Sequence, residues 1–395
     1  MRKMKTILVY RWKAYNYVDV IAGFRSLGYD VDEIYHTMES YDEDEEMAEI
    51  LHSSLRKKSY DFVFTMNYFP VISDVCQEEK IRYLCWTCDS PLISMYHQSV
   101  YNSVNRIFTF DKTNELEFRA MGVSGIHYLP LGVEVERLDR LLQQSRPGAD
   151  ERFLDEISFV GSLYERNSYD RLEGRLGEFL QGYFAAVMEI QSRQYGRGDV
   201  MEAALTEEVM EQLQEALKLE KSQRSFADIG LVFPVTSLGF KVAQIQRIRD
   251  LVMLSKYKKV SIYSNSNATD LMTLVYKGGV DYWTEMPFVF RDSRVNLNFT
   301  IPNIRSGIPL RVWDVLGAGG FLLTNFQAEL PMYFENGKHL VWFSSEEELK
   351  EKALYYSDTR HERERQAIAR AGYELVKKEH TYRKRIRQML EMAEE

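Results

Sequence analysis

The sequence predicts an α/β protein with two domains, each built on a mainly parallel sheet, and with a helical insertion in the second domain. Short runs of β-branched and aromatic residues alternate with amphipathic segments, which is the pattern of βαβ units. This alternation stops at a polar, turn-rich stretch near residue 140 and again over a long helical stretch that begins near residue 170. The length of 395 residues agrees with two domains of roughly 100–200 residues each.

The composition excludes several classes of protein. Hydrophobic residues make up 45% and charged residues 28%, so the chain is not globally disordered. The net charge of −9 argues against a protein that coats nucleic acid. No run approaches the roughly 20 apolar residues of a membrane span, and the first apolar run is too short for a signal peptide. We therefore expect a cytoplasmic protein with no transmembrane segment and no nucleic-acid partner.

Residues 1–135 are expected to form the first domain. Its first helix spans residues 17–27 and is followed by Gly28, because glycine adopts the left-handed conformation of helix ends at little cost. The polar stretch 136–155 is expected to be a linker. The expected strands of this domain cover residues 6–10, 29–34, 60–65, 81–86, 106–110 and 126–130.

Residues 156–370 are expected to form the second domain. Its helical insertion covers about residues 170–255, where the stretch 201–221 is rich in the strong helix formers Glu, Leu, Gln and Ala. Residues 371–395 form a final helix that we expect to pack back on the first domain. The expected strands of the second domain cover residues 156–160, 259–263, 295–299, 321–324 and 339–343.

The loop 303–314 is the richest candidate site, because ligands of open parallel sheets bind outside the carboxyl ends of the strands. Gly307 helps to shape the turn, and Arg305 and Arg311 add positive charge near the start of the following helix. Such a helix start is a plausible seat for a diphosphate. One helical turn further, Asp314 could accept hydrogen bonds from ribose hydroxyls. The alternative is an ordinary helix start with surface arginines.

Two other loops follow predicted strands in the same way. Gly161 and Arg166 follow the first strand of the second domain, where the arginine could reach an anionic ligand. In the first domain, Arg11, Trp12 and Lys13 could contact a sugar or a phosphate on the acceptor side. Each loop could equally be a solvated turn.

A carboxylate after the strand 81–86 is a candidate general base. Asp89 would act on an acceptor hydroxyl, and His97 is the rival base. The alternatives are a turn former beside a proline for Asp89 and a helix-surface residue for His97.

The three cysteines do not form a disulfide framework. Cys85 and Cys88 have the C-x-x-C spacing, and with Cys76 and His97 they could in principle hold zinc. Buried cysteines on a strand explain the same pattern. We therefore predict no metal site.

At residues 306–325 the sequence resembles a known family. The run Ser306-Gly-Ile-Pro-Leu-Arg-Val-Trp-Asp314, followed by Leu-Gly-Ala-Gly-Gly320 and Phe-Leu-Leu-Thr-Asn325, resembles the donor-binding segment of GT-B glycosyltransferases. It looks closest to the CgeB-like (spore maturation protein) group of bacterial enzymes. Upstream, the runs 128–133 and 157–162 resemble the end of the N-terminal domain and the opening strand of the donor domain. The resemblance spans nearly the whole chain and is strongest at 295–345.

The resemblance implies two Rossmann-like domains with a cleft between them. It also implies a nucleotide-sugar donor held mainly by the C-terminal domain, and no obligatory metal or other cofactor. Many retaining GT-B enzymes carry two glutamates eight positions apart; here the second corresponds to Asp314 and the first to Ser306, which cannot hold a charge. Arg311 matches an arginine usual in the CgeB-like group and is the expected phosphate ligand.

The expected activity is that of a hexosyltransferase-type glycosyltransferase. Arg311 and the helix start would stabilise the departing diphosphate, and Asp89 would activate the hydroxyl of a protein, glycan or lipid-linked acceptor. Two alternatives stay open. One is a GT-B sugar-nucleotide epimerase, and the other is a non-catalytic nucleotide-sugar-binding protein whose helical insertion recruits a protein partner.

Overall fold

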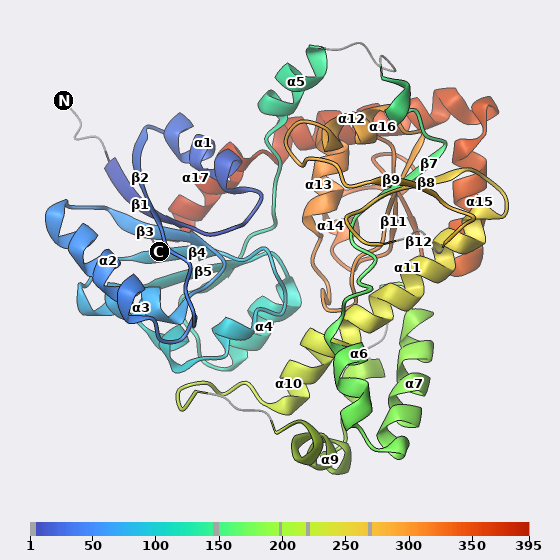
Figure 1. The fold of residues 1–395 in the computed structure, drawn as a ribbon. Helices are drawn as coiled ribbons and strands as arrows, with labels where there is room; N and C mark the ends of the chain where they lie inside the picture. Colours follow the sequence, from blue (N-terminus) through green and yellow to red (C-terminus); the bar gives the residue numbers. More distant parts are fainter. Residues whose placement is uncertain (1–4, 145–149, 197–199, 219–221, 268–270, 395) are drawn as a thin grey trace. The chain divides into compact units, whose positions relative to one another are not determined.

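The computed structural model describes residues 5–144, 150–196, 200–218, 222–267 and 271–394. These residues form two compact units (Figure 1). Unit 1 comprises the described residues up to 134 together with 222–227 and 380–394, and unit 2 comprises the described residues of 135–218 and 228–379. Each unit has its own sheet.

Unit 1 contains a six-stranded parallel sheet in the order β2-β1-β3-β4-β5-β6. All six strands predicted for the first domain are present, with ends that differ by up to two residues. The two strands in the middle of the sheet, β3 and β4, are buried along their whole length and are apolar except for Thr65, as expected for a sheet covered on both faces. The strands are β1 (Lys5–Arg11), β2 (Tyr29–Tyr35), β3 (Phe62–Met66), β4 (Tyr83–Trp86), β5 (Asn105–Thr109) and β6 (Ile126–Tyr128).

The final helix of the chain packs in unit 1 against the first one, side by side in Figure 1. Gly23 makes this close contact possible, because a Cβ there would lie 2.4 Å from Cδ1 of Ile386. The return to unit 1 begins at residue 380 rather than at 371. The helices of this unit are α1 (Tyr17–Ser26), α2 (Glu45–Lys57), α3 (Pro70–Glu78), α4 (Lys112–Ala120), α17 (Tyr382–Met392) and the 3₁₀ turns η1 (Ile93–Met95) and η2 (Gln98–Tyr101).

Unit 2 contains a second six-stranded parallel sheet, in the order β12-β11-β10-β7-β8-β9. The sequence predicted five of these strands and missed β9, an edge strand that is only partly buried and lacks an apolar run. The strands are β7 (Ile157–Val160), β8 (Val260–Tyr263), β9 (Val275–Gly278), β10 (Val295–Asn298), β11 (Leu322–Asn325) and β12 (Val341–Phe343).

The described residues of the stretch predicted as a linker, 136–144 and 150–155, belong to unit 2. This stretch contains the helix α5 (Val135–Gln143) and the 3₁₀ turn η3 (Glu151–Phe153), and Phe153 is buried. The other helices near the sheet are α12 (Met286–Asp292), α13 (Leu310–Gly317), α14 (Leu330–Tyr333), α15 (Glu346–Ser357), η6 (Thr359–His361) and α16 (Glu362–Glu379).

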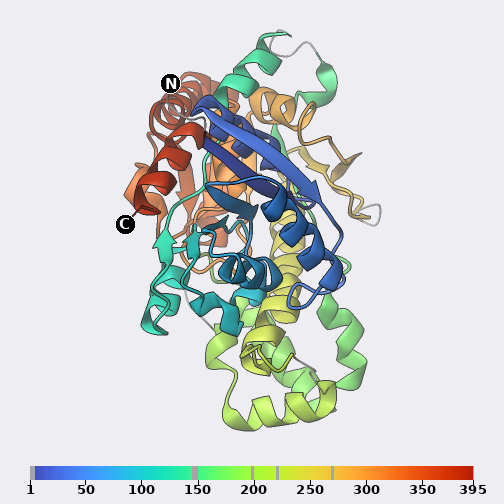
Figure 2. The same ribbon diagram turned by 90° about the vertical axis from the view of Figure 1, so that its left-hand side faces the viewer.

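All described elements between β7 and β8 are helical, as predicted. Most of them form a lobe away from the sheet, joined to it by the long helix α11, and the lobe has its own apolar core (Figures 1 and 2). The elements are α6 (Ser168–Leu172), η4 (Glu173–Arg175), α7 (Glu178–Ser192), α8 (Val200–Ala203), α9 (Glu207–Leu217), α10 (Ile229–Phe233), the π-helical turn η5 (Pro234–Leu238) and α11 (Gly239–Ser255).

The stretch Ile229–Ser255 is the one described helix that is long and apolar enough, by composition, to cross a membrane. Half of its most apolar window is buried inside the protein. Val242 packs in the core of the lobe, and Leu251 and Leu254 pack in the core beside the sheet. The apolar character of this stretch is therefore accounted for by packing within unit 2.

Helix α11 also carries a buried carboxyl group, Asp250. Nε of Arg249 donates to Oδ1 at 3.0 Å, and the hydroxyl of Tyr195 donates to Oδ2 at 2.8 Å. Burial raises the pKa of Asp250 to about 6, and these two partners offset only part of that increase. The folded state therefore binds the proton of Asp250 more tightly than the unfolded chain does.

This raised pKa predicts how stability depends on pH. The contribution of Asp250 to the free energy of unfolding is largest below its unfolded pKa of about 4 and is lost as the pH rises through 6. Between pH 4.5 and 7 we expect the wild type to lose about 2 kcal/mol relative to Asp250→Asn, whose side chain does not titrate there. Urea unfolding of both proteins at each pH measures this difference, and a constant difference would contradict the prediction.

Candidate functional site

The strand order of unit 2 reverses between β7 and β10, and ligands of open α/β sheets bind outside the carboxyl ends of the strands at such a switch point. Arg247 of α11 joins the two loops that leave these strands. Its Nη1 donates to the carbonyl oxygen of Ser162 and its Nη2 to that of Phe299, both at 2.6 Å. The side chain of Arg247 thus lies at the switch point.

Arg247 and its surroundings make the switch point of the sheet positively charged. Its guanidinium lies over the rings of Phe159 and Tyr164, 5.4 and 4.7 Å from their centroids, and its Nε is buried without a hydrogen-bond partner among the described residues. Burial is the main cause that lowers the pKa of Arg247, and the positive charge of Arg311 acts in the same direction while Tyr164 opposes it. Two neighbouring guanidinium groups favour an anionic ligand.

Sequence reasoning missed Arg247. The sequence did contain a signal for it. Arg247 is four residues from both Ala243 and Leu251, so it falls on the apolar stripe of the helix. A charged residue is rare on such a stripe unless it is paired.

Arg311 and Asp314 lie together on α13, as the sequence predicts. Nη1 of Arg311 is 3.4 Å from Oδ2 of Asp314 and contacts Sδ of Met286, and its guanidinium lies 5.1 Å from the ring centroid of Phe290. The hydroxyl of Tyr282 donates to Oδ1 of Asp314 at 3.0 Å. Both charged side chains are partly exposed, so a ligand can reach them.

The other residues of this loop have different positions. Arg305 forms an ion pair with Glu202 of α8, so its charge is already partly neutralised. Gly307 is buried beside Ser306. Each arginine of this loop therefore has a carboxylate neighbour: Glu202 for Arg305 and Asp314 for Arg311.

A buried carboxylate lies next to Ser306. The hydroxyl of Ser306 donates to Oε1 of Glu329 at 2.7 Å, and the backbone N–H of Glu329 donates to the carbonyl oxygen of Ser306 at 3.2 Å. Glu329 is 2% exposed and precedes α14, in the loop after β11. The acidic group that the sequence lacks at position 306 is thus present nearby, supplied by a residue that sequence reasoning did not single out.

The loop after β7 contributes backbone rather than charge. The N–H of Gly161 donates to the carbonyl oxygen of Tyr263 at 3.0 Å. Tyr164 has a left-handed backbone with φ of 58°, which is uncommon outside glycine and directs its ring to Arg247. Arg166 is exposed.

In unit 1 the strand order reverses between β1 and β3. Trp12 lies at this point, where its Nε1 donates to the carbonyl oxygen of Met66 at 2.7 Å. Arg11 is held by Glu33, with an Nη1–Oε2 distance of 2.9 Å, and by the hydroxyl of Tyr35. Of the three predicted acceptor-side residues, Lys13 is exposed, whereas Arg11 and Trp12 are partly buried.

Asp89 is exposed after β4 and is positioned by Asn67. Nδ2 of Asn67 donates to Oδ2 of Asp89 at 2.7 Å, and Oδ1 of Asn67 accepts from the N–H of Cys88 at 2.8 Å. The surrounding protein raises the pKa of Asp89 even though the side chain is exposed, and the hydrogen bond from Asn67 opposes this shift. A raised pKa suits a general base better than that of a free carboxylate. Asn67, which has a φ of 62°, was not foreseen from the sequence.

His97 is not a helix-surface residue. It is 1% exposed, and its Nδ1 accepts a hydrogen bond from the N–H of Ser99 at the start of η2. Burial is the main cause that lowers the pKa of His97, so the ring is neutral near pH 7. A substrate cannot reach this ring as it is placed, which leaves Asp89 as the better placed of the two proposed bases.

Among the described residues, no group of three or more His, Cys, Asp or Glu side chains is arranged to hold a metal ion. Cys76, Cys85 and Cys88 are free thiols, and burial raises the pKa of each well above its usual value.

Comparisons with known proteins agree with this architecture. Residues 244–391, which include Arg247, Arg311, Asp314 and Glu329, match the glycosyl transferase-like family. No curated protein matches the sequence of this chain.

Three solved structures show the fold. HepE of Anabaena, crystallised with UDP, has a TM-score of 0.56 at 8% identity, covering 99% of this chain and 100% of its own. The sucrose-phosphate synthase of Thermosynechococcus elongatus has a TM-score of 0.55 at 9% identity, covering 99% and 98% of the two chains. The UDP-forming α,α-trehalose-phosphate synthase of Burkholderia xenovorans has a TM-score of 0.55 at 11% identity, covering 99% of both chains. The chain therefore has the α/β fold of the GT-B glycosyltransferases, and its residues 244–391 match the glycosyl transferase-like family.

Proposed function

We propose that this protein is a glycosyltransferase that moves a sugar from a nucleoside-diphosphate sugar to an acceptor hydroxyl. The observation that carries the proposal is the grouping of Arg311 and Asp314 on α13 with Arg247 at the switch point of the sheet, all within the segment that matches the glycosyl transferase-like family. HepE, which shares the fold, was crystallised with UDP, so a uridine nucleotide is the first donor to test. We further propose that the chain belongs to the CgeB-like group.

The donor would be held by unit 2. Arg311 and the N–H groups at the start of α13 bind the diphosphate, and Arg247 adds positive charge behind them. Asp314 accepts hydrogen bonds from the ribose hydroxyls. Because two guanidinium groups and a helix start supply the positive charge, we propose that transfer needs no divalent metal.

In the chemical step, one side chain would stabilise the negative charge of the leaving diphosphate and another would stabilise the positive charge of the sugar. The bond between the anomeric carbon and the diphosphate breaks, and its electron pair leaves with the diphosphate, which Arg311 stabilises. The sugar develops positive charge, which the buried carboxylate of Glu329 stabilises beside Ser306. The acceptor oxygen forms the new bond, and its proton passes to Asp89, the proposed general base of unit 1.

A thermal-shift screen with UDP, GDP, TDP and CDP, with and without magnesium, tests the donor site. A ligand at 100 times its Kd stabilises the folded protein by about 2.7 kcal/mol, so one diphosphate is expected to raise the Tm without magnesium. Arg311→Ala is expected to abolish that rise. Arg363→Ala, which removes the same charge from an exposed position of α16, is the control and is expected to keep it.

Several outcomes would contradict the proposal. No response to any diphosphate, or a response unchanged in Arg311→Ala, would exclude this donor site. A response that requires magnesium would exclude the metal-independent mechanism. Conversion of the sugar nucleotide to its epimer without any acceptor would indicate an epimerase instead.

A further inference from the structure

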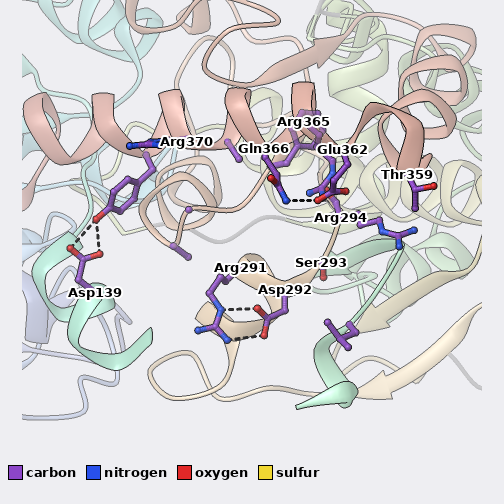
Figure 3. A pocket seen from close by; sticks show the side chains of 16 residues that line it. Asp139, Arg291, Asp292, Ser293, Arg294, Thr359, Glu362, Arg365, Gln366 and Arg370 are labelled. Carbon is purple, nitrogen blue, oxygen red and sulfur yellow. Dashed lines mark hydrogen bonds and ion pairs between the residues drawn. The ribbon is translucent and has the colours of Figure 1, made fainter. Parts of the chain in front are cut away.

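Unit 2 has an open cavity of about 730 Å³ that the proposed mechanism does not use. Arg294 and Phe321, which line it, immediately precede β10 and β11. The cavity therefore lies at the amino ends of these parallel strands, at the edge of the sheet opposite Arg247 and Arg311. Helices α5, α12 and α16 supply most of the remaining wall (Figure 3).

The carboxylates in this cavity already have partners within unit 2. Four arginines and three carboxylates line the cavity, which leaves the lining one net positive charge. The carboxylate pairs are Asp292 with Arg291 at 2.6 Å, Glu362 with Arg365 at 2.5 Å, and Asp139 with Lys377 at 2.8 Å and with the hydroxyl of Tyr373 at 2.7 Å.

Several donors in the same cavity have no acceptor, or only distant ones. Oγ of Ser293, 2% exposed, and Nε of Arg365, 8% exposed, have no hydrogen-bond partner among the described residues. The guanidinium of Arg294 reaches only the carbonyl oxygen of Ser357 at 3.5 Å and Glu156 at 3.9 Å. Arg370 is exposed and makes no hydrogen bond or ion pair with the described residues. A buried donor without an acceptor is costly, and an acceptor bound in the cavity, either water or a ligand, would remove that cost.

Ser293, Arg294 and Arg365 lie toward one end of the cavity, whereas Arg370 lies toward the other end, on the side of Asp139 (Figure 3). Nη1 of Arg365 donates to the carbonyl oxygen of Arg294 at 3.0 Å, and Ser293 is the next residue along the chain. Leu154, a leucine that is 49% exposed, lines the cavity together with Phe321 and Ala369. The cavity thus combines a cluster of donors with an apolar wall, which is the composition of sites for small organic ligands.

We propose that this cavity is a second binding site that takes an organic phosphate monoester. The phosphate accepts hydrogen bonds from Ser293, Arg294 and Arg365, and Arg370 adds positive charge. The organic part packs against Leu154 and the apolar wall. This site does not depend on the donor site, because the two lie at opposite edges of the sheet.

Isothermal titration with phenyl phosphate tests this site in the full-length protein. Phenyl phosphate carries both the charge and an apolar part, whereas inorganic phosphate lacks the apolar part and phenol lacks the charge. We expect phenyl phosphate to bind more tightly than either. Arg370→Ala and Ser293→Ala are each expected to raise its Kd about tenfold, because Ser293→Ala removes a hydrogen bond to the charged phosphate and Arg370→Ala removes a positive charge from the cavity.

The controls separate this site from the donor site. Arg363→Ala removes an exposed arginine of α16 that does not line the cavity, and Arg311→Ala removes the proposed phosphate ligand of the donor; both are expected to keep the wild-type Kd. Loss of binding in Arg311→Ala but not in Arg370→Ala would assign the ligand to the donor site and overturn the proposal. Absence of binding, or equal affinity for phenol and phenyl phosphate, would also overturn it. Wild-type affinity for phenyl phosphate in both Ser293→Ala and Arg370→Ala would also overturn the proposal.

Discussion

Replacing Arg247 with methionine is expected to destabilise unit 2 by about 2 kcal/mol and to weaken nucleoside-diphosphate binding more than tenfold. Methionine keeps the apolar stem but leaves the carbonyl oxygens of Ser162 and Phe299 without their donors. An unsatisfied buried carbonyl costs about 1–3 kcal/mol, and the loss of a desolvated charge offsets part of the total for the pair. Binding falls further because the two loops at the switch point lose their shared anchor.

The measurements are urea unfolding and the Tm rise produced by the best diphosphate. Lys256→Met, at the exposed end of α11, removes a positive charge from the same helix without touching either loop and is the matched control. If Arg247→Met and Lys256→Met behave alike in both measurements, Arg247 neither anchors the loops nor supports the donor.

Replacing Glu329 with glutamine is expected to lower kcat at least a hundredfold while nucleotide binding and Tm stay near their wild-type values. Glutamine retains an oxygen that accepts the hydrogen bond of Ser306, so the local structure is kept. The charge is lost, and with it the stabilisation of the positive sugar in the transition state. An interaction made only in the transition state affects kcat and leaves ground-state binding alone.

Release of nucleoside diphosphate from the donor found in the thermal-shift screen measures this effect. Glu335→Gln removes a carboxylate from an exposed side chain in the following loop and is expected to leave kcat unchanged. Ser306→Ala keeps the charge of Glu329 and is expected to lose much less activity than Glu329→Gln. A Glu329→Gln protein with wild-type kcat would show that the carboxylate has a structural role only.

The strand pattern of both sheets was readable from the sequence because a buried parallel strand needs a short run of apolar residues. Eleven of the twelve strands were predicted, and the missing one, β9, is a partly buried edge strand that carries Lys277 and Gly278. The helix α5 was taken for part of a linker because the polar stretch that follows it outweighed its own apolar face.

For the candidate site too, the sequence predicted some features correctly and missed others. Arg311 and Asp314 are three residues apart on one helix, so helical geometry alone places them side by side. His97 was predicted as a candidate base, with a helix-surface residue as the alternative, but the packing around η2 buries it, and burial cannot be read from one residue and its neighbours in the chain.

The remaining features of the site depend on contacts between distant segments. Arg247 is 85 and 52 residues from the two carbonyl groups that it joins, and Glu329 is 23 residues from Ser306. Periodicity and spacing describe neighbours along one helix or strand, whereas these contacts exist only because parallel strands bring their carboxyl ends to one edge of the sheet. Local sequence was therefore sufficient for most of the secondary structure and for the neighbouring pair Arg311 and Asp314, whereas long-range packing supplied the contacts of Arg247 and the hydrogen bond between Ser306 and Glu329.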